Sequence, residues 1–190
     1  MLSRVFLVCL SLSVCTEGSP LGCRWMDHRF TQYSQVCLDL LDAMAQNSTN
    51  SSTEATEEDT VAFPSELYSQ ASEAPAEDKL AFAVQVLNEM AALFQEDHSA
   101  ASWEEKTGDR FVNIITQQAH SLRSCIGSRS HKKKNKRLHV YFKRLSELVL
   151  KEMGYSADAW ELIRKEIRTH LMKADHMVSS LRTTSLNTVR

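Results

Sequence analysis

The sequence is poor in glycine and proline, and it has no strong charge of either sign. Its 190 residues include only five glycines and three prolines. Because these residues form turns and interrupt regular elements, their scarcity favours a few long helices over many short strands. The 22 basic and 24 acidic side chains give a net charge of -2, so no global field indicates a nucleic-acid-binding or membrane-binding protein. The length suits a single domain.

Motifs of enzymatic chemistry are also missing from the sequence. The seven histidines are scattered, without metal-ligand spacing, and the chain has no nucleophile elbow and no glycine-rich phosphate loop. We therefore expect no enzymatic activity, no metal site and no cofactor. We interpret His98 and His170 as polar surface or capping residues.

The first 22 residues have the layout of a secretory signal peptide. A basic residue precedes an apolar run from Val5 to Val14, and small and turn-forming residues follow. The run is too short to anchor the mature chain in a bilayer. We expect cleavage after Gly18 or Gly22 and a secreted, extracellular domain over residues 23–190. The alternative is a buried N-terminal helix.

Secretion changes the meaning of the cysteines and of two sequons. Cys23, Cys37 and Cys125 remain after cleavage in an oxidising compartment, where one intramolecular disulfide at most can form among three thiols. Cys37 lies on the apolar stripe of the first expected helix, so we interpret it as a buried free thiol rather than a disulfide or reactive residue. Asn47 and Asn50 each begin a glycosylation sequon, and we expect a glycan on at least one of them.

Apolar residues recur at helical spacing in five stretches, and no strand-like alternation of useful length is present. The stretches cover residues 26–44, 76–95, 102–125, 138–153 and 156–181. The third begins with a predicted capping box at Ser102 and Glu105, and the last begins with Ser156 as a predicted N-cap. In the fourth stretch, Leu148 and Met153 are expected on the apolar face.

A long polar and acidic connection, residues 46–73, joins the first two stretches. Its second half carries apolar residues that we expect to pack onto the bundle as an overhand segment, while Pro64 prevents a helix from running through it. These apolar residues are Val61, Phe63, Leu67 and Tyr68.

A basic run, Lys132 to Arg137, lies between the third and fourth stretches. We interpret it as a solvated loop, and weak glycosaminoglycan binding is the alternative. Because no aromatic residues are interleaved to stack on bases, the run does not predict nucleic-acid binding.

The last stretch has two different sides. Trp160, Ile163 and Ile167 belong to a stripe that we expect in the core, because successive helical residues turn by about 100°. We expect Arg164, Lys165, Arg168 and Met172 beside that stripe and outside the core. A membrane-surface helix is excluded, because the bundle needs the apolar stripe and the interspersed acids would repel anionic lipid.

Five spaced motifs resemble type I interferons, most closely those of bony fish, over essentially the whole mature chain. They are CRWMDHRF, FPSELY, ASWEEKTGDRFVNIITQQ, YFKRLS and DAWELIRKE. The resemblance implies an all-α cytokine bundle of about five helices with up-up-down-down topology and a long first overhand loop. It also implies a disulfide from Cys23 to Cys125. Asp158 stands where mammalian alpha interferons carry a second-bridge cysteine, as in the two-cysteine group of fish interferons.

The resemblance further implies an antiviral cytokine that binds two different class II cytokine receptor chains (cytokine receptor family B) and activates STAT transcription factors. Matching the last motif places the first receptor contact on Arg164, Lys165, Arg168 and Thr169. His139 and exposed positions of the second to fourth helices are candidates for the second contact. We expect a monomer. The alternatives are another secreted four-helix cytokine or hormone, and a cationic antimicrobial protein, which the net charge disfavours.

Overall fold

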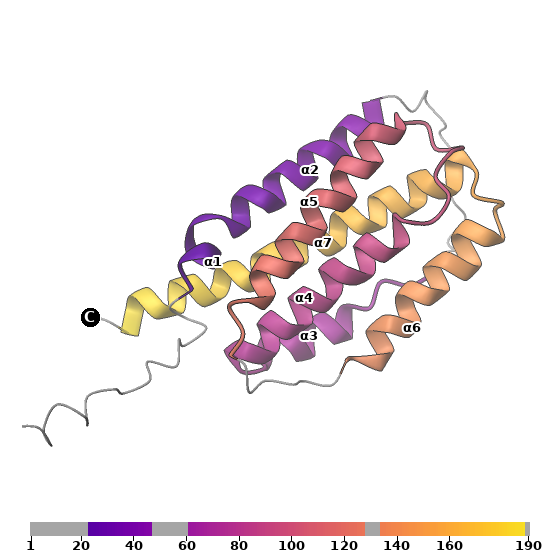
Figure 1. Ribbon diagram of the computed structural model, residues 1–190. Coiled ribbons are helices and arrows are strands. Elements are labelled where there is room, and N and C mark those ends of the chain that lie inside the picture. Colours follow the sequence, from indigo (N-terminus) through magenta and orange to yellow (C-terminus); the bar gives the residue numbers. More distant parts are fainter. Residues whose placement is uncertain (1–22, 47–60, 128–133, 189–190) are drawn as a thin grey trace, which may run out of the picture.

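The computed structural model describes residues 23–46, 61–127 and 134–188, and every regular element in these ranges is a helix (Figure 1). In chain order they are α1 (Arg24–His28), α2 (Phe30–Gln46), α3 (Ser65–Glu73), α4 (Ala76–Leu93), α5 (Glu105–Arg123), α6 (Lys136–Arg144), the π-helical segment η2 (Leu145–Lys151) and α7 (Ala157–Thr188). The all-α prediction is therefore confirmed. The predicted signal peptide and both sequon asparagines, Asn47 and Asn50, lie outside the described residues.

Four long helices, α2, α4, α5 and α7, make the bundle. Both α5 and α7 pack against α2 and against α4. Figure 1 shows α2 and α4 running in one direction and α5 and α7 in the opposite one, which is the expected up-up-down-down arrangement. The added helix α6 packs on α4, and η2 packs on α7. No helix in the described ranges is long and apolar enough to cross a membrane.

Trp160 is a packing residue, as the sequence predicted. Its side chain is fully buried, and the rings of Phe94, Trp103 and His98 surround it at centroid distances of 5.5, 5.8 and 6.0 Å. The indole Nε1–H donates to the backbone oxygen of Asp97 at 3.1 Å. Because the N–H of a buried indole needs an acceptor, this hydrogen bond allows the Trp160 side chain to be fully buried.

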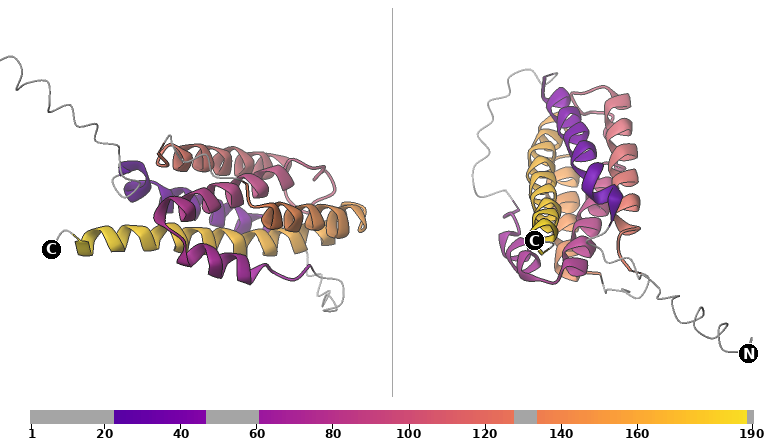
Figure 2. Two further views of the ribbon diagram at one scale, coloured as in Figure 1. Left: turned by 90° about the horizontal axis from the view of Figure 1, so that it is seen from below. Right: turned by 90° about the vertical axis from the view of Figure 1, so that its left-hand side faces the viewer.

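The overhand segment, which we define as residues 61–73, packs onto the bundle as expected. Val61, Leu67 and Tyr68 are buried, and Figure 2 shows α3 lying along α7 in both views. The sequence did not predict α3 itself. Pro64 precedes this helix instead of interrupting it, since proline is tolerated at a helix start, where no N–H is needed.

One predicted helix start is confirmed and the other is wrong. The Ser156 hydroxyl accepts the backbone N–H of Ala159 at 3.3 Å, which is the predicted cap. In contrast, α5 begins at Glu105 with Glu104 as its N-cap, without a side-chain cap bond, and the buried Ser102 hydroxyl has no partner. Trp103 is buried at this point, in a bend that covers residues 101–103 and precedes the helix.

The apolar face predicted for the fourth stretch is wrong at two positions. Leu148 and Met153 are exposed, whereas Leu150, which was not expected on this face, is buried; Val149 is buried as expected. The chain forms the π-helix η2 here. A π-helix has more residues per turn than an α-helix, so the side chains after Leu145 point in directions that a period of 3.6 does not predict.

The disulfide between Cys23 and Cys125 is present, with a Cα–Cα distance of 5.4 Å and a sequence separation of 102. It ties the start of α1 to the residues that follow α5, which confirms the pairing that the resemblance implied. Cys37 is free and fully buried on α2. Burial raises the pKa of its thiol to about 12.

We predict that Cys37 does not react with thiol reagents in the native protein, because the reactive thiolate is suppressed and the side chain is inaccessible. Mass spectrometry after treatment with iodoacetamide near neutral pH should show no adduct, and one adduct after unfolding without reductant. Labelling of the folded protein would contradict the buried position of this thiol.

Candidate functional site

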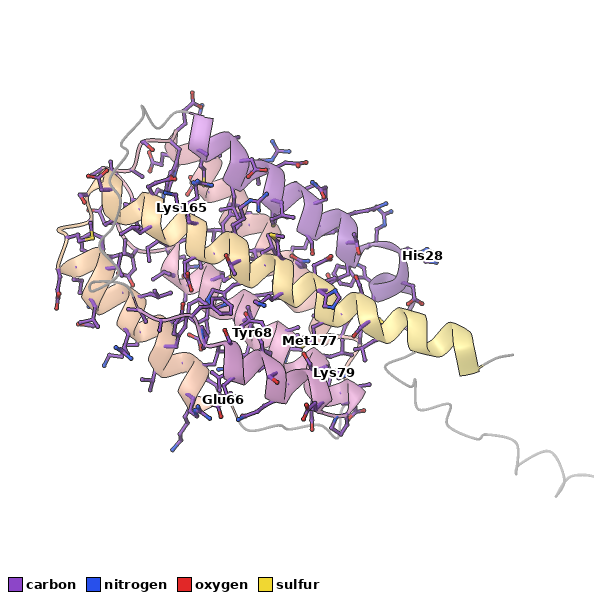
Figure 3. All side chains as sticks on the ribbon, turned by 180° about the vertical axis from the view of Figure 1, so that it is seen from behind. His28, Glu66, Tyr68, Lys79, Lys165 and Met177 are labelled. Atoms are coloured by element: carbon purple, nitrogen blue, oxygen red, sulfur yellow. A yellow bond between two sulfur atoms is a disulfide. The ribbon has the colours of Figure 1, made fainter. Side chains whose placement is uncertain are left out.

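The exposed side of the first half of α7 carries the residues that the sequence singled out. Lys165 and Thr169 are exposed, the Arg168 side chain is 41% exposed, and Met172 is 50% exposed. We call these four residues the α7 flank. Figure 3 shows α7 lying between α2 and α3, with Lys165 near its start and Tyr68 on the side of α3.

Two basic residues of the α7 flank make ion pairs in which the cation is exposed. Arg168 Nε donates to Asp42 Oδ1 on α2 at 3.1 Å. Lys165 Nζ lies 3.6 Å from Glu161 Oε1, and 61% of the lysine side chain but only 15% of the glutamate side chain is exposed. Surface pairs contribute about 0 to 1 kcal/mol, and Glu161 keeps its two bonds to Arg164, so both cations can be transferred to carboxylates of a partner at little cost. Sequence reasoning missed Asp42, because its proximity to Arg168 depends on the packing of α2 against α7.

Arg164 does not belong to the exposed flank, and the prediction that it lies outside the core is wrong. Its side chain is only 8% exposed. The guanidinium donates to both carboxylate oxygens of Glu161 at 2.8 and 2.7 Å, and Nη1 donates to the backbone oxygen of Leu41 at 3.2 Å. Hydrogen bonding to Glu161 raises the pKa of Arg164 above its usual value. Arg164 therefore fastens α7 to the C-terminal part of α2.

His170 was expected at the surface, and this prediction is also wrong, because its side chain is fully buried. Nδ1 lies 2.6 Å from the Tyr68 hydroxyl on α3. Nε2 lies 3.3 Å from the Tyr141 hydroxyl on α6 and 3.5 Å from Glu166 Oε1. The Tyr141 hydroxyl also donates to Glu166. Burial lowers the pKa of His170 below its ordinary value of 6.5, although Glu166 opposes this effect.

His98 is half-buried next to Trp160, and its Nδ1 lies 3.1 Å from the backbone oxygen of Glu96. Because α4 ends at Leu93, this carbonyl belongs to the loop that follows and the bond does not cap the helix. His98 is therefore neither a surface residue nor a cap of α4, and its buried Nε2 has no hydrogen-bond partner. Across the described ranges, no group of three or more histidine, cysteine or acidic residues is placed to hold a metal ion.

The described part of the basic run, residues 134–137, is partly neutralised by acidic residues. Lys134 Nζ lies 2.9 Å from Glu89 Oε1, His139 Nδ1 lies 3.1 Å from Glu89 Oε2, and Arg137 pairs with Glu66 at 3.0 Å. The Glu89 carboxylate is mostly buried on α4, and it lines a groove of about 850 Å³ between α3, α4 and the start of α6. Lys132 and Lys133 lie outside the described part of the chain.

Comparison with known proteins adds sequence and structural relatives. The sequence profile of the family described as "Interferon alpha/beta domain" matches residues 26–181. Interferon a3 of Oncorhynchus mykiss is 35% identical over 174 residues, which are 91% of this chain and 95% of that protein. Interferon alpha-H of Bos taurus is 30% identical over 85% of this chain and 87% of its own length. The solved structure of zebrafish interferon 1 superposes with a TM-score of 0.70 at 27% identity, covering 84% of this chain and all of that structure.

Proposed function

The chain belongs to the type I interferon family, and on that premise we propose that it is a secreted antiviral cytokine that brings together two different class II cytokine receptor chains. Kinases associated with these receptors then activate STAT transcription factors and induce interferon-stimulated genes. The observation that carries the proposal is the match over nearly the whole mature chain to a fish interferon. The same match disfavours a hormone or an interleukin that uses another receptor.

The first receptor chain is proposed to bind Lys165, Arg168 and Thr169 on the α7 flank, together with the neighbouring overhand segment. Exposed cations in weak pairs support this assignment. Arginine is frequent among binding hot spots, because its stem buries apolar area while its fork binds carboxylates. The buried Arg164 contributes to this surface by holding α7 against α2 rather than by presenting its charge.

The second receptor chain is proposed to bind the exposed faces of α4, α5 and α6, where the His139 side chain is 52% exposed. Weak glycosaminoglycan binding through Lys132 to Arg137 is a second proposal, and it has to compete with the pairs that Lys134 and Arg137 already make. Because neither surface requires a second copy of the chain, the active form is proposed to be a monomer.

Adding the purified mature protein to fish cells that respond to type I interferon should produce STAT phosphorylation and then antiviral gene expression. The response should saturate with dose, because it depends on occupancy of surface receptors. A reduced and alkylated sample of the same protein is the control, and it should be much less active. A folded protein that produces no STAT phosphorylation in responsive cells would refute the proposed function.

A further inference from the structure

Three separate segments of the chain meet at one buried imidazole. His170 on α7 contacts Tyr68 on α3 and Tyr141 on α6 through its two ring nitrogens, and the Phe63 and Phe142 rings lie 4.7 and 4.8 Å from it. The overhand segment therefore has a polar attachment to α7 inside an otherwise aromatic environment.

Both ring nitrogens of His170 have suitable hydrogen-bond partners when the imidazole is neutral. Glu166 is an acceptor on the Nε2 side, so the ring proton belongs on Nε2, and Nδ1 then accepts the Tyr68 hydroxyl. A second proton on Nδ1 would turn this acceptor into a donor and place a charge in a buried site. The hydrogen bond that holds Tyr68 would then be lost or have to reverse.

The attachment lies directly beside the α7 flank. Thr169 precedes His170 in the helix, and the Lys173 Nζ lies 5.6 Å from the centre of the Phe63 ring. Lys173 follows Met172 and lies about one turn after Thr169, so Phe63 borders one side of the flank through Lys173, while Asp42 of α2 borders the other through Arg168. A protein that binds the flank from outside meets the overhand segment at the same time.

We propose that His170 is a positioning residue, whose bond to Tyr68 holds the overhand segment against the α7 flank so that the two present a single surface to the first receptor chain. This inference rests on the proposed function, since it assigns a role within the same binding surface. The imidazole does not touch the receptor. It acts through Tyr68 and the segment that Tyr68 anchors.

The proposal includes a pH dependence, and its sign follows from the groups that face the ring. Glu166 favours the protonated imidazole, whereas burial and Lys173 disfavour it, with a net decrease in the pKa of His170. Tyr68 and Tyr141 are uncharged at neutral pH, and burial raises their pKa values further above the ordinary value. Because the pKa of His170 is lower in the docked state than its ordinary value of 6.5, the neutral imidazole stabilises docking at pH values above 6.5. This stabilisation is lost as the pH falls below 6.5. Acidification should therefore weaken the docking of the overhand segment.

Four single variants of the full mature chain distinguish the role of Nδ1 from that of Nε2. His170→Asn places an amide near the position of Nδ1 and can keep the hydrogen bond to Tyr68. His170→Gln places its amide near the position of Nε2 and loses the hydrogen bond to Tyr68. Tyr68→Phe removes the hydroxyl alone. Tyr155→Phe is the matched control, because it removes a tyrosine hydroxyl that bonds Glu96 elsewhere in the fold.

Hydrogen exchange followed by mass spectrometry measures the docking of the overhand segment directly. Exchange in residues 65–73 should accelerate about five- to tenfold in Tyr68→Phe and His170→Gln, which is the effect of one lost buried hydrogen bond. His170→Asn and Tyr155→Phe should remain near wild type. After correction for intrinsic rates, the wild type should lose protection between about pH 7 and pH 5.5, and His170→Asn should not.

The dose of protein that gives half-maximal STAT phosphorylation tests the link to the receptor. It should rise in Tyr68→Phe and His170→Gln by the factor by which hydrogen exchange shows the docked fraction to fall, because only the docked fraction is competent to bind. Equal exchange in Tyr68→Phe and Tyr155→Phe would overturn the attachment. A smaller docked fraction with an unchanged dose response would overturn the link to binding. A wild-type protein without activity would instead refute the proposed function, and the exchange measurements would still decide the attachment.

Discussion

Signalling is expected to be lost when the charges of Lys165 and Arg168 are reversed together to glutamate. Both side chains are exposed, and each makes only a weak ion pair. Reversal therefore leaves the fold intact while it removes two cations from the proposed receptor contact. Truncated hot-spot residues cost 2 kcal/mol or more each, so the half-maximal dose should rise by at least about a hundredfold. STAT phosphorylation in responsive fish cells is the measurement.

Arg29→Glu is the control for charge reversal at an exposed arginine outside the proposed receptor contact. Arg29 is an exposed arginine between α1 and α2, and Figure 1 places this junction at the opposite end of the bundle from the start of α7. The control should signal like the wild type. Normal signalling by the folded Lys165 and Arg168 double variant would show that the receptor contact lies elsewhere.

Reversal at Arg164 should behave differently, and it distinguishes a contact from a structural residue. A glutamate at this position would face the mostly buried Glu161, which would keep only its longer pair with Lys165, and the hydrogen bond to the Leu41 carbonyl would be lost. Breaking a buried pair by removing one partner costs about 3 to 5 kcal/mol. We therefore expect a lower thermal midpoint together with lower activity, whereas the Lys165 and Arg168 variant should lose activity alone.

Replacing Cys23 and Cys125 together by serine is expected to lower the free energy of unfolding by about 3 to 5 kcal/mol and the thermal midpoint by about 10 °C. The bridge joins residues 102 apart, so its removal greatly increases the conformational freedom of the unfolded chain. It also frees α1 from the end of α5. Guanidinium denaturation and calorimetry of both proteins would measure the change.

Cys37→Ala is the appropriate control for the disulfide variant, because it removes a buried cysteine that forms no bridge. It should cost about 1 kcal/mol, the effect of a small cavity. A disulfide variant no less stable than Cys37→Ala would show that the bridge contributes little, and that α1 and α5 are held together by packing alone.

Much of this architecture could be predicted from periodicity. Trp160, Ile163 and Ile167 are fully buried as expected, because apolar residues at helical spacing over a long stretch define the inner side of a helix with little ambiguity. The pairing of Cys23 with Cys125 was available only through the resemblance, since three cysteines alone allow several pairings. The buried position of Cys37 followed from its place on the first apolar stripe.

The candidate site was predicted only in part, because a helical period describes one helix without its neighbours. It placed Lys165 and Arg168 correctly outside the core, but it could not show that α2 covers Arg164 or that α3 covers His170. Polar side chains can be buried when other segments supply partners for their hydrogen bonds, as Leu41 and Tyr68 do here. The order and inner faces of most helices were thus determined by the sequence. Which polar residues become structural was decided by the packing of segments far apart in the chain, since only that packing supplies their partners.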